Sequence, residues 1–460
     1  MSSPATKSQV TSPQFKRRFM IRLIAVLIGG MFLDGYILGI LGPVFGNIES
    51  ELSIDVIWIG LIAAGPLFGI FVGSPLMGWA TDKFGRKPMF LIDMALFVIA
   101  SAAQFFVAGE GVAAALQLFI IRFLMGVAIG GEYAIGWPLL SEFSPPKIRG
   151  RLLGATVSAW YIGFMFAFIA GTVMNNAGLP WRVVIGSSTL LAVVIFVARL
   201  GLPESPSWLI GKGRRDEALA IARRYIQSAE LHESITQEID LRVIQLEQAR
   251  VDAKKHAPAS FATLFSSQYW RVTLFTAGFW FCAVTPFFAI ATFADQVLAP
   301  YGIHSGGIGI SALAAAGVII TVLLIDKLGR RILTVPTQWL CAVMLLVIGV
   351  WTDAPVVVIA TLFFAFAFFN GGYNTLTQIY PSELYPSEVR GIGMGFAAAV
   401  SRIGAALGTF ALPWSMENLG AGTSMIIAAG IAFVGAGLSQ WLAPETKGKS
   451  LAETAQGYSH

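Results

Sequence analysis

Long apolar segments recur along the whole chain, and they constrain its fold more than any other feature. Each is about 20 residues long, the length that a helix needs to cross a bilayer. Hydrocarbon offers no partner to backbone N–H and C=O groups, so each segment is predicted to be helical. The sequence therefore predicts an all-α membrane protein with twelve transmembrane helices near 20–42, 57–79, 87–108, 112–140, 150–175, 182–201, 270–296, 306–326, 331–352, 354–380, 389–414 and 420–443.

The charges indicate how these helices are oriented. Hydrophobic residues make up 56% of the 460 and charged residues 12%, with a net charge of +5. The basic residues occur in the loops of one face, namely KRR at 16–18, DKFGRK at 82–87, KIRGR at 147–151, DKLGRR at 326–331 and EVR at 388–390. By the positive-inside rule this face and both termini are cytoplasmic. The basic charge then reflects membrane topology and not nucleic-acid binding, and a multi-pass inner-membrane protein is expected.

Nothing in the sequence indicates a cofactor or an enzyme. Both cysteines, Cys282 and Cys341, fall within predicted spans, and all four histidines fall outside them. No His/Cys cluster with metal-ligand spacing occurs, and no Gly-rich phosphate loop follows a strand. No nucleophile–base pair is visible. We therefore expect no metal, no cofactor and no enzymatic activity.

The chain repeats itself at an offset of about 241 residues. DKFGRK at 82–87 recurs as DKLGRR at 326–331, and SEFSPPKIRG at 141–150 recurs as SELYPSEVRG at 382–391. Such a six-plus-six duplication predicts a substrate site between the halves near the bilayer midplane. The predicted organisation is an N-terminal tail, a first bundle, a linker with short amphipathic helices on the cytoplasmic surface, a second bundle and a C-terminal tail, at 1–19, 20–201, 202–268, 269–443 and 444–460.

These motifs resemble those of the major facilitator superfamily. GWATDKFGRK at 78–87 is similar to its loop between helices 2 and 3, and PESPSWL at 203–209 and PETKG at 444–448 resemble its sugar-porter and organic-ion-transporter branch. RFLMGVAIGGEYAIG at 122–136 is similar to helix 4 of bacterial metabolite:proton symporters. The resemblance covers nearly the whole chain. It implies two six-helix bundles, transport by alternating access and, by family default, a monomer.

The resemblance also implies a latch on the cytoplasmic side. Asp82 would pair with an arginine at a neighbouring helix end, and Arg86 with Glu142. The other expected members are Asp326, Arg330, Arg331, Glu383, Arg149, Arg390, Glu204 and Glu445, with Asp93 expected in the same region. The alternative is that basic loops only fix topology. Acids at matched places in both halves argue against it.

Four ionisable residues within predicted spans are the candidates for function, because charges at the centre of a membrane helix are costly and usually functional. Asp34 and Glu132 are the expected proton carriers, and Arg122, ten residues before Glu132, would pair with whichever is ionised. In sugar porters a helix-1 acid is coupled to the helix-4 arginine. Helix 1 here reads D-G-Y-I, so Ile37 replaces the second acid of the D-G-Y-D pattern in aromatic-acid porters. A purely structural network is the alternative. Arg402 would bind an anionic substrate group or cap a local network.

A polar stripe on predicted helix 10 indicates the substrate surface. Its members recur at three- and four-residue spacing: Asn370, Tyr373, Asn374, Thr377 and Gln378. Aromatic residues of predicted helices 5 and 7 are possible stacking partners for a ring of the solute, with plain packing as the alternative: Trp160, Tyr161, Trp280, Phe287 and Phe288.

The favoured function is uptake of a small polar metabolite with protons across the membrane, with a small organic acid, aromatic or sugar-derived, as the solute. A sugar or polyol and an organic cation remain open as solutes. Proton-antiport drug efflux is disfavoured, because 158–174 lacks the Pro of the helix-5 antiporter motif. A membrane sensor built on a transporter scaffold is a further alternative, although 202–268 carries no signalling motif. The expected partners are the solute, protons and lipid.

Overall fold

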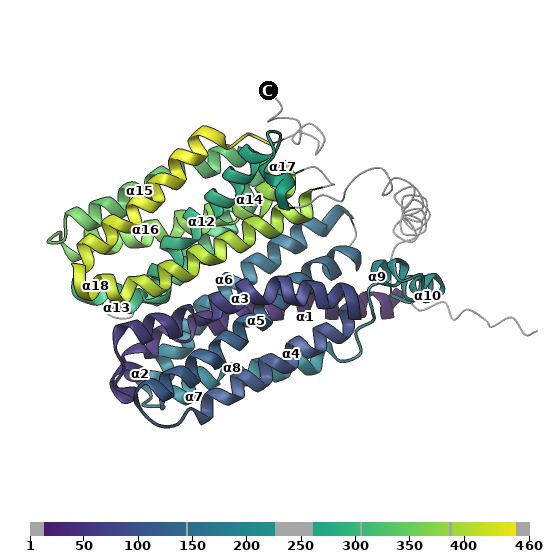
Figure 1. Cartoon of the computed structure of the whole chain (residues 1–460), viewed down its shortest axis with the longest axis horizontal. Coiled ribbons are helices and arrows are strands. Elements are labelled where there is room, and N and C mark those ends of the chain that lie inside the picture. Colours follow the sequence, from purple (N-terminus) through teal and green to yellow (C-terminus); the bar gives the residue numbers. More distant parts are fainter. Residues whose placement is uncertain (1–12, 144–145, 226–260, 304–305, 386–388, 448–460) are drawn as a thin grey trace, which may run out of the picture.

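The computed structural model describes residues 13–143, 146–225, 261–303, 306–385 and 389–447, and they form two helical bundles side by side (Figure 1). The first bundle comprises α1 (Pro13–Gly39), α2 (Phe45–Leu52), α3 (Val56–Phe84), α4 (Arg86–Ala103), α5 (Gly111–Phe143), α6 (Pro146–Asn176), α7 (Trp181–Gly186) and α8 (Ser188–Arg199). The second comprises α12 (Trp270–Thr292), α13 (Ala294–Leu298), α14 (Gly306–Leu328), α15 (Arg330–Val350), α16 (Val356–Asn374), α17 (Leu376–Leu384) and α18 (Arg390–Leu442).

The predicted number of spans is confirmed. In the described part of the chain, 11 helices are long and apolar enough to cross a membrane. The last of them, within α18, bends at Gly420, where φ is 85° and ψ is 160°. Glycine adopts this left-handed φ without the penalty of a Cβ, so α18 turns back on itself and crosses twice. Twelve crossings result, six in each bundle.

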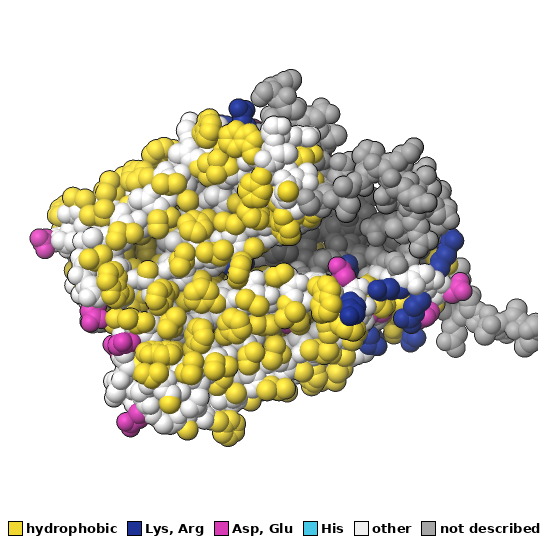
Figure 2. All heavy atoms as spheres, in the orientation of Figure 1, with side chains coloured by type: hydrophobic (Ala, Val, Ile, Leu, Met, Phe, Trp, Pro, Cys, Tyr) yellow, Lys and Arg dark blue, Asp and Glu magenta, His cyan; other side chains and the backbone are white. Residues whose placement is uncertain are grey.

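The surface has the charge distribution that the loops predicted. Hydrophobic side chains cover the flanks of both bundles (Figure 2). Lysine and arginine gather at the end where α9 (Pro206–Gly211) and α10 (Arg215–Tyr225) lie, and acidic residues gather at the opposite end. α9 and α10 occupy the predicted linker, whose residues 226–260 lie outside the described residues.

Glycines bring neighbouring helices of a bundle into backbone contact. A Cβ on Gly163 of α6 would lie 2.0 Å from the carbonyl oxygen of Phe32 in α1, and one on Gly126 of α5 would lie 2.0 Å from that of Pro66 in α3. Helices in lipid associate through close van der Waals packing, which small residues permit. These contacts fix the positions of α1 and α5, the two helices that carry the predicted proton residues.

Gly163→Ala is expected to destabilise the protein by about 1–3 kcal/mol, because the new methyl group overpacks the α1–α6 contact. The measurement is the thermal unfolding midpoint in detergent. Gly430→Ala in α18 is the matched control, since a Cβ there would meet nothing within 4 Å. Equal midpoints for the two variants would contradict the packing argument.

The two bundles touch at their extracellular ends. The Phe45 and Phe293 rings stack with centroids 4.6 Å apart. A Cβ on Gly60 of α3 would lie 2.4 Å from the carbonyl oxygen of Phe410 in α18. Nearer the cytoplasmic end α6 and α14 remain in contact, since a Cβ on Gly154 would lie 3.3 Å from Val322 Cγ1. The two bundles are therefore held together by close contacts at their extracellular ends.

Candidate functional site

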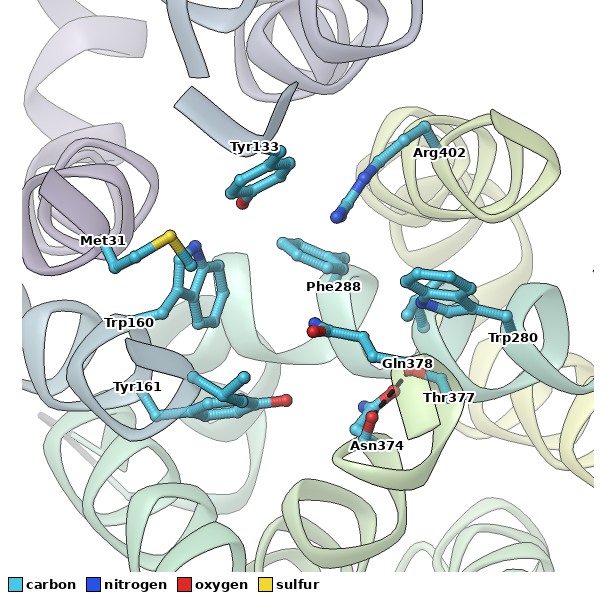
Figure 3. A pocket seen from close by; sticks show the side chains of 12 residues that line it. Met31, Tyr133, Trp160, Tyr161, Trp280, Phe288, Asn374, Thr377, Gln378 and Arg402 are labelled. Atoms are coloured by element: carbon cyan, nitrogen blue, oxygen red, sulfur yellow. Dashed lines mark hydrogen bonds between the residues drawn. The ribbon is translucent and has the colours of Figure 1, made fainter. Parts of the chain in front are cut away.

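A pocket lies between the two bundles, with about 490 Å³ of space that includes some open solvent. It is enclosed by side chains from α1, α5 and α6 of the first bundle and α12, α16, α17 and α18 of the second (Figure 3). The lining residues are Met31, Tyr133, Val157, Trp160, Tyr161, Trp280, Val284, Phe288, Asn374, Thr377, Gln378 and Arg402. A solute in this pocket would touch both bundles, which is where the duplication predicts the substrate site.

Arg402 carries the positive charge of this pocket. Its guanidinium carbon lies 5.4 Å from the centre of the Tyr133 ring, across the interface between the bundles. Figure 3 shows the guanidinium group of Arg402 and the amide of Gln378 both directed into the space in front of Phe288. A cation over an aromatic face is attracted to that face. This pairing with Tyr133 keeps the guanidinium group of Arg402 extended into the pocket.

The polar stripe of predicted helix 10, which corresponds to α16 and α17 in the structure, divides into two groups. Asn374, Thr377 and Gln378 line the pocket, whereas Asn370 and Tyr373 do not. Asn370 donates from its amide to the Tyr373 hydroxyl at 2.6 Å and to the Ala283 carbonyl at 3.3 Å. The Asn374 amide nitrogen donates to Asn370 Oδ1 at 2.7 Å. Asn370 and Tyr373 therefore lie behind the pocket and fix the orientation of Asn374.

The predicted aromatic residues divide in the same way. Trp160, Tyr161 and Trp280 line the pocket, while Phe287 packs beside Tyr161 with ring centroids 5.6 Å apart. Sequence reasoning missed Tyr133 as a lining residue. Its position directly after Glu132 in the GGEY segment is the signal that could have indicated it.

A second cluster, which we call the acid cluster, is buried inside the first bundle. It consists of Asp34, Asp93, Glu132 and Arg199, from α1, α4, α5 and α8, each at most 1% exposed. Arg199 Nη2 lies 2.7 Å from Glu132 Oε2, and Arg199 Nη1 lies 3.7 Å from Asp93 Oδ2. Arg199 thus contacts two of the three carboxyl groups of the cluster.

Close packing gives the acid cluster a defined shape. A Cβ on Gly30 would lie 2.3 Å from Glu132 Oε1 and 2.4 Å from Arg199 Nη2. The Arg199 guanidinium carbon also lies 3.7 Å from the centre of the Phe90 ring. The absence of a side chain on Gly30 therefore lets α1 approach the ion pair, while Phe90 covers the guanidinium.

Arg199 is the functional candidate that sequence reasoning missed. It falls near the end of the predicted span 182–201. An arginine that follows a run of apolar residues within a span is the signal that could have indicated a buried charge. Asp93 was expected in the latch region, but the structure places it in the acid cluster. Arg199 is the last residue of α8, and Asp93 lies two turns inside α4, so their meeting depends on how the two helices pack and is not revealed by hydropathy.

Arg122 lies apart from the acids with which it was expected to pair. It is 1% exposed, and its Nη2 donates to the Ile37 carbonyl oxygen at 3.2 Å. That carbonyl belongs to the last turn of α1, where oxygens lack helical partners and the helix dipole favours a cation. Ten residues advance a helix by about 1000°, some 80° short of three turns. Arg122 and Glu132 therefore point in different directions, and the expected pairing is replaced by Arg199 with Glu132.

The cytoplasmic loops carry the same arrangement in both halves. Glu204 accepts hydrogen bonds from the backbone N–H groups of Arg86 at 2.9 Å and Lys87 at 3.1 Å. Glu445 accepts from those of Arg330 at 2.9 Å and Arg331 at 3.0 Å. Each carboxylate thus sits at a helix N-terminus, α4 or α15, where unpaired N–H groups bind anions.

Further contacts surround the loop of the second half. Arg330 Nη2 lies 2.9 Å from Glu383 Oε1 and its Nη1 lies 3.6 Å from Asp326 Oδ1. Partial burial acts to raise the pKa of Glu445, but hydrogen bonds from four backbone amides outweigh it and lower that pKa below its ordinary value. In the first half, the Trp208 indole donates to the Asp82 carbonyl oxygen at 3.0 Å. The side chains of Glu142, Arg149 and Arg390 lie outside the described residues.

Comparisons with known proteins agree with this architecture. The family model for "Sugar (and other) transporter" matches residues 22–458. YaaU of Escherichia coli (strain K12) is 33% identical over 433 residues, which cover 93% of this chain and 92% of YaaU. The inner membrane metabolite transport protein YgcS of the same organism is 32% identical over 434 residues, with coverage of 94% and 92%. The proton:xylose symporter XylE of E. coli shares the fold, with a TM-score of 0.75 at 19% identity over 96% of this chain and 100% of XylE.

Proposed function

The chain belongs to the sugar (and other) transporter family of the major facilitator superfamily, and from this premise we propose that it is a proton symporter for a small organic acid. As a member of this family it is a multi-pass membrane transporter and not an enzyme. The solute would bind between the bundles and be released as they rock about the central pocket. The pocket supports the choice of solute, and the acid cluster supports coupling to protons.

The observation that supports the solute class is the position of Arg402 in the lining of the pocket. Among the described residues that line the pocket it is the one with a full charge, and that charge is positive. A guanidinium group binds a carboxylate through two parallel hydrogen bonds. Trp160, Trp280 and Phe288 offer apolar faces to the body of the same solute. An aromatic or sugar-derived carboxylate fits this combination better than a cation does.

Asn374, Thr377 and Gln378 favour a second candidate, a sugar or polyol. Amide and hydroxyl groups can donate to and accept from hydroxyl groups. The same three side chains would bind the hydroxyl groups of a sugar-derived acid, so they do not by themselves distinguish the two solutes. The distinction depends on whether binding requires a negative charge.

Proton coupling is supported by the burial of Asp34 and Glu132. Both side chains are at most 1% exposed, and together with Asp93 they outnumber the arginine of the cluster three to one. Surplus negative charge in a medium of low dielectric is costly, so the cluster is most stable when it binds protons. Movement of the bundles that changes access to the cluster then changes its proton occupancy.

We further propose that the loop clusters act as a gate. Glu204 and Glu445 hold the N-termini of α4 and α15, and Arg330 joins Asp326 and Glu383. All of these contacts stay within one half of the chain in the structure. Closure would bring the two loop clusters toward each other. Asp82, Arg86, Glu142, Arg149 and Arg390 remain predicted members of this gate.

The test of function compares charged solutes with their neutral analogues. Purified protein is screened by thermal shift at two pH values against small carboxylic acids, their amides and the related polyols. Solutes that bind are then tested for uptake into proteoliposomes with an imposed pH gradient. Stabilisation by an acid but not its amide, with uptake driven by the gradient, supports the proposal. Stabilisation by neutral polyols or by cations alone would overturn the solute class.

Arg402→Gln is expected to weaken binding of the carboxylate about tenfold to a hundredfold, since a hydrogen bond to a charged group contributes about 1.5–3 kcal/mol. The measurement is the Kd from binding titrations. Binding of the amide analogue should change little, and that comparison serves as the control. An equal loss for acid and amide would assign Arg402 to packing.

A further inference from the structure

Asp93 and Glu132 are two buried carboxyl groups that contact the same arginine, Arg199. Asp93 is 0% exposed and Glu132 is 1% exposed, and a single guanidinium group, that of Arg199, can neutralise only one of the two if both are ionised. A Cβ on Gly131 would lie 2.6 Å from Asp93 Oδ1, so α4 approaches α5 closely beside Glu132. Ionised carboxylates can only accept hydrogen bonds. A hydrogen bond between them therefore requires one proton.

The charges around the pair agree with one shared proton. Arg199 of α8 contacts both members, at 2.7 Å and 3.7 Å. Asp34 of α1 and the more distant Arg402 of α18 are the other charged groups that act on the cluster, and Tyr133 of α5 faces its edge. One proton shared by the pair leaves a single negative charge, which the charge of Arg199 neutralises. Asp34 then stays outside this neutral unit.

We propose that Asp93 and Glu132 share a single proton beside Arg199 and form a second proton site of the transporter, next to Asp34. This inference rests on the proposed proton symport. When the proton leaves, the O–H···O hydrogen bond breaks, the proton passes to water, and the unit changes from neutral to a net charge of −1. Two repelling carboxylates then compete for Arg199, which among the described residues is the cation that contacts both. Asp93 thereby becomes a coupling residue, and Arg199 positions the pair.

The direct test is infrared spectroscopy of the purified protein, which detects the carbonyl stretch of protonated carboxyl groups without any solute. Asp34→Asn removes the signal of Asp34. In that background we expect a buried protonated carboxyl band to persist at neutral pH, and to disappear when Asp93→Asn or Glu132→Gln is added. Glu417→Gln, at an exposed position on the extracellular surface, is the control and should leave the band unchanged. Absence of the band in the Asp34→Asn variant would overturn the shared proton.

Stability gives a second, independent readout. Asn at position 93 resembles a protonated Asp, because its amide can donate to Glu132 while Glu132 still pairs with Arg199. Asp93→Asn alone should therefore leave the unfolding midpoint unchanged within error and abolish accumulation driven by the pH gradient. If Asp93 were simply an ionised partner of Arg199, the same variant would lower the midpoint, and that result would reject the shared proton.

The outcomes separate the inference from the proposed function. If the wild-type protein shows no proton-driven accumulation of any solute that binds, symport itself fails. If the wild type accumulates solute and Asp93→Asn does so with the same pH profile, symport stands and the second proton site fails. Loss of accumulation with retained solute exchange in Asp93→Asn supports both.

Discussion

Asp34→Asn is expected to abolish accumulation driven by a pH gradient while solute binding persists. The Asp34 side chain is fully buried, and within the described residues neither of its carboxyl oxygens has a hydrogen-bond partner. Both Arg199 and Arg402 act on its charge. Asp34 is therefore influenced both by the other members of the acid cluster and by the arginine of the pocket. Asn keeps the shape of a protonated Asp but cannot release a proton, so the step that links transport to the gradient is lost.

The measurement compares two assays on the same proteoliposomes. Uptake with an imposed pH gradient should fall to the level of protein-free vesicles, whereas exchange of solute at equal pH on both sides should continue. Exchange needs no net proton movement and so serves as the internal control for folding. Accumulation at the wild-type level in Asp34→Asn would show that this carboxyl group takes no part in coupling.

Arg199→Gln should cause the largest loss of stability of any variant considered. Arg199 is 1% exposed, and its guanidinium group contacts Glu132 and Asp93. Removing one partner of a buried ion pair costs about 3–5 kcal/mol, because the remaining charge has no compensation. We expect a lower thermal midpoint in detergent and a lower yield of folded protein. Adding Glu132→Gln to Arg199→Gln should restore part of that stability, because it removes one of the uncompensated carboxylates.

Arg214→Gln is the matched control for this experiment. Arg214 also pairs with a glutamate, Glu217 at 2.6 Å, but the two side chains are 50% and 56% exposed. Exposed ion pairs contribute about 0–1 kcal/mol, so the midpoint should hardly move. A similar midpoint for Arg199→Gln and Arg214→Gln would mean that water reaches the acid cluster and that its charges are not confined.

Much of the candidate site could be predicted from residue type and periodicity. Trp160, Tyr161, Trp280 and Arg402 line the pocket, and Asp34 and Glu132 are buried as expected of ionisable groups within spans. The cost of placing a charge or a polar stripe in lipid is large enough to show in a single sequence. Which buried charged side chains pair with each other was harder to predict from the sequence. The pairing of Glu132 with Arg199 instead of Arg122 depends on helix rotation and on contacts between helices far apart in the chain.

The sequence by itself determined the twelve crossings, their orientation and the two matched halves, because hydrocarbon thickness and loop charge act on each segment independently of the others. Only the tertiary structure decided which side chains meet. It placed Arg199 and Asp93 beside Glu132, turned Arg122 to the end of α1, and put Asn370 and Tyr373 behind the pocket. These contacts follow from how closely glycines such as Gly30 and Gly131 let helices approach. That distance is a property of packed pairs of helices and cannot be read from one helix alone.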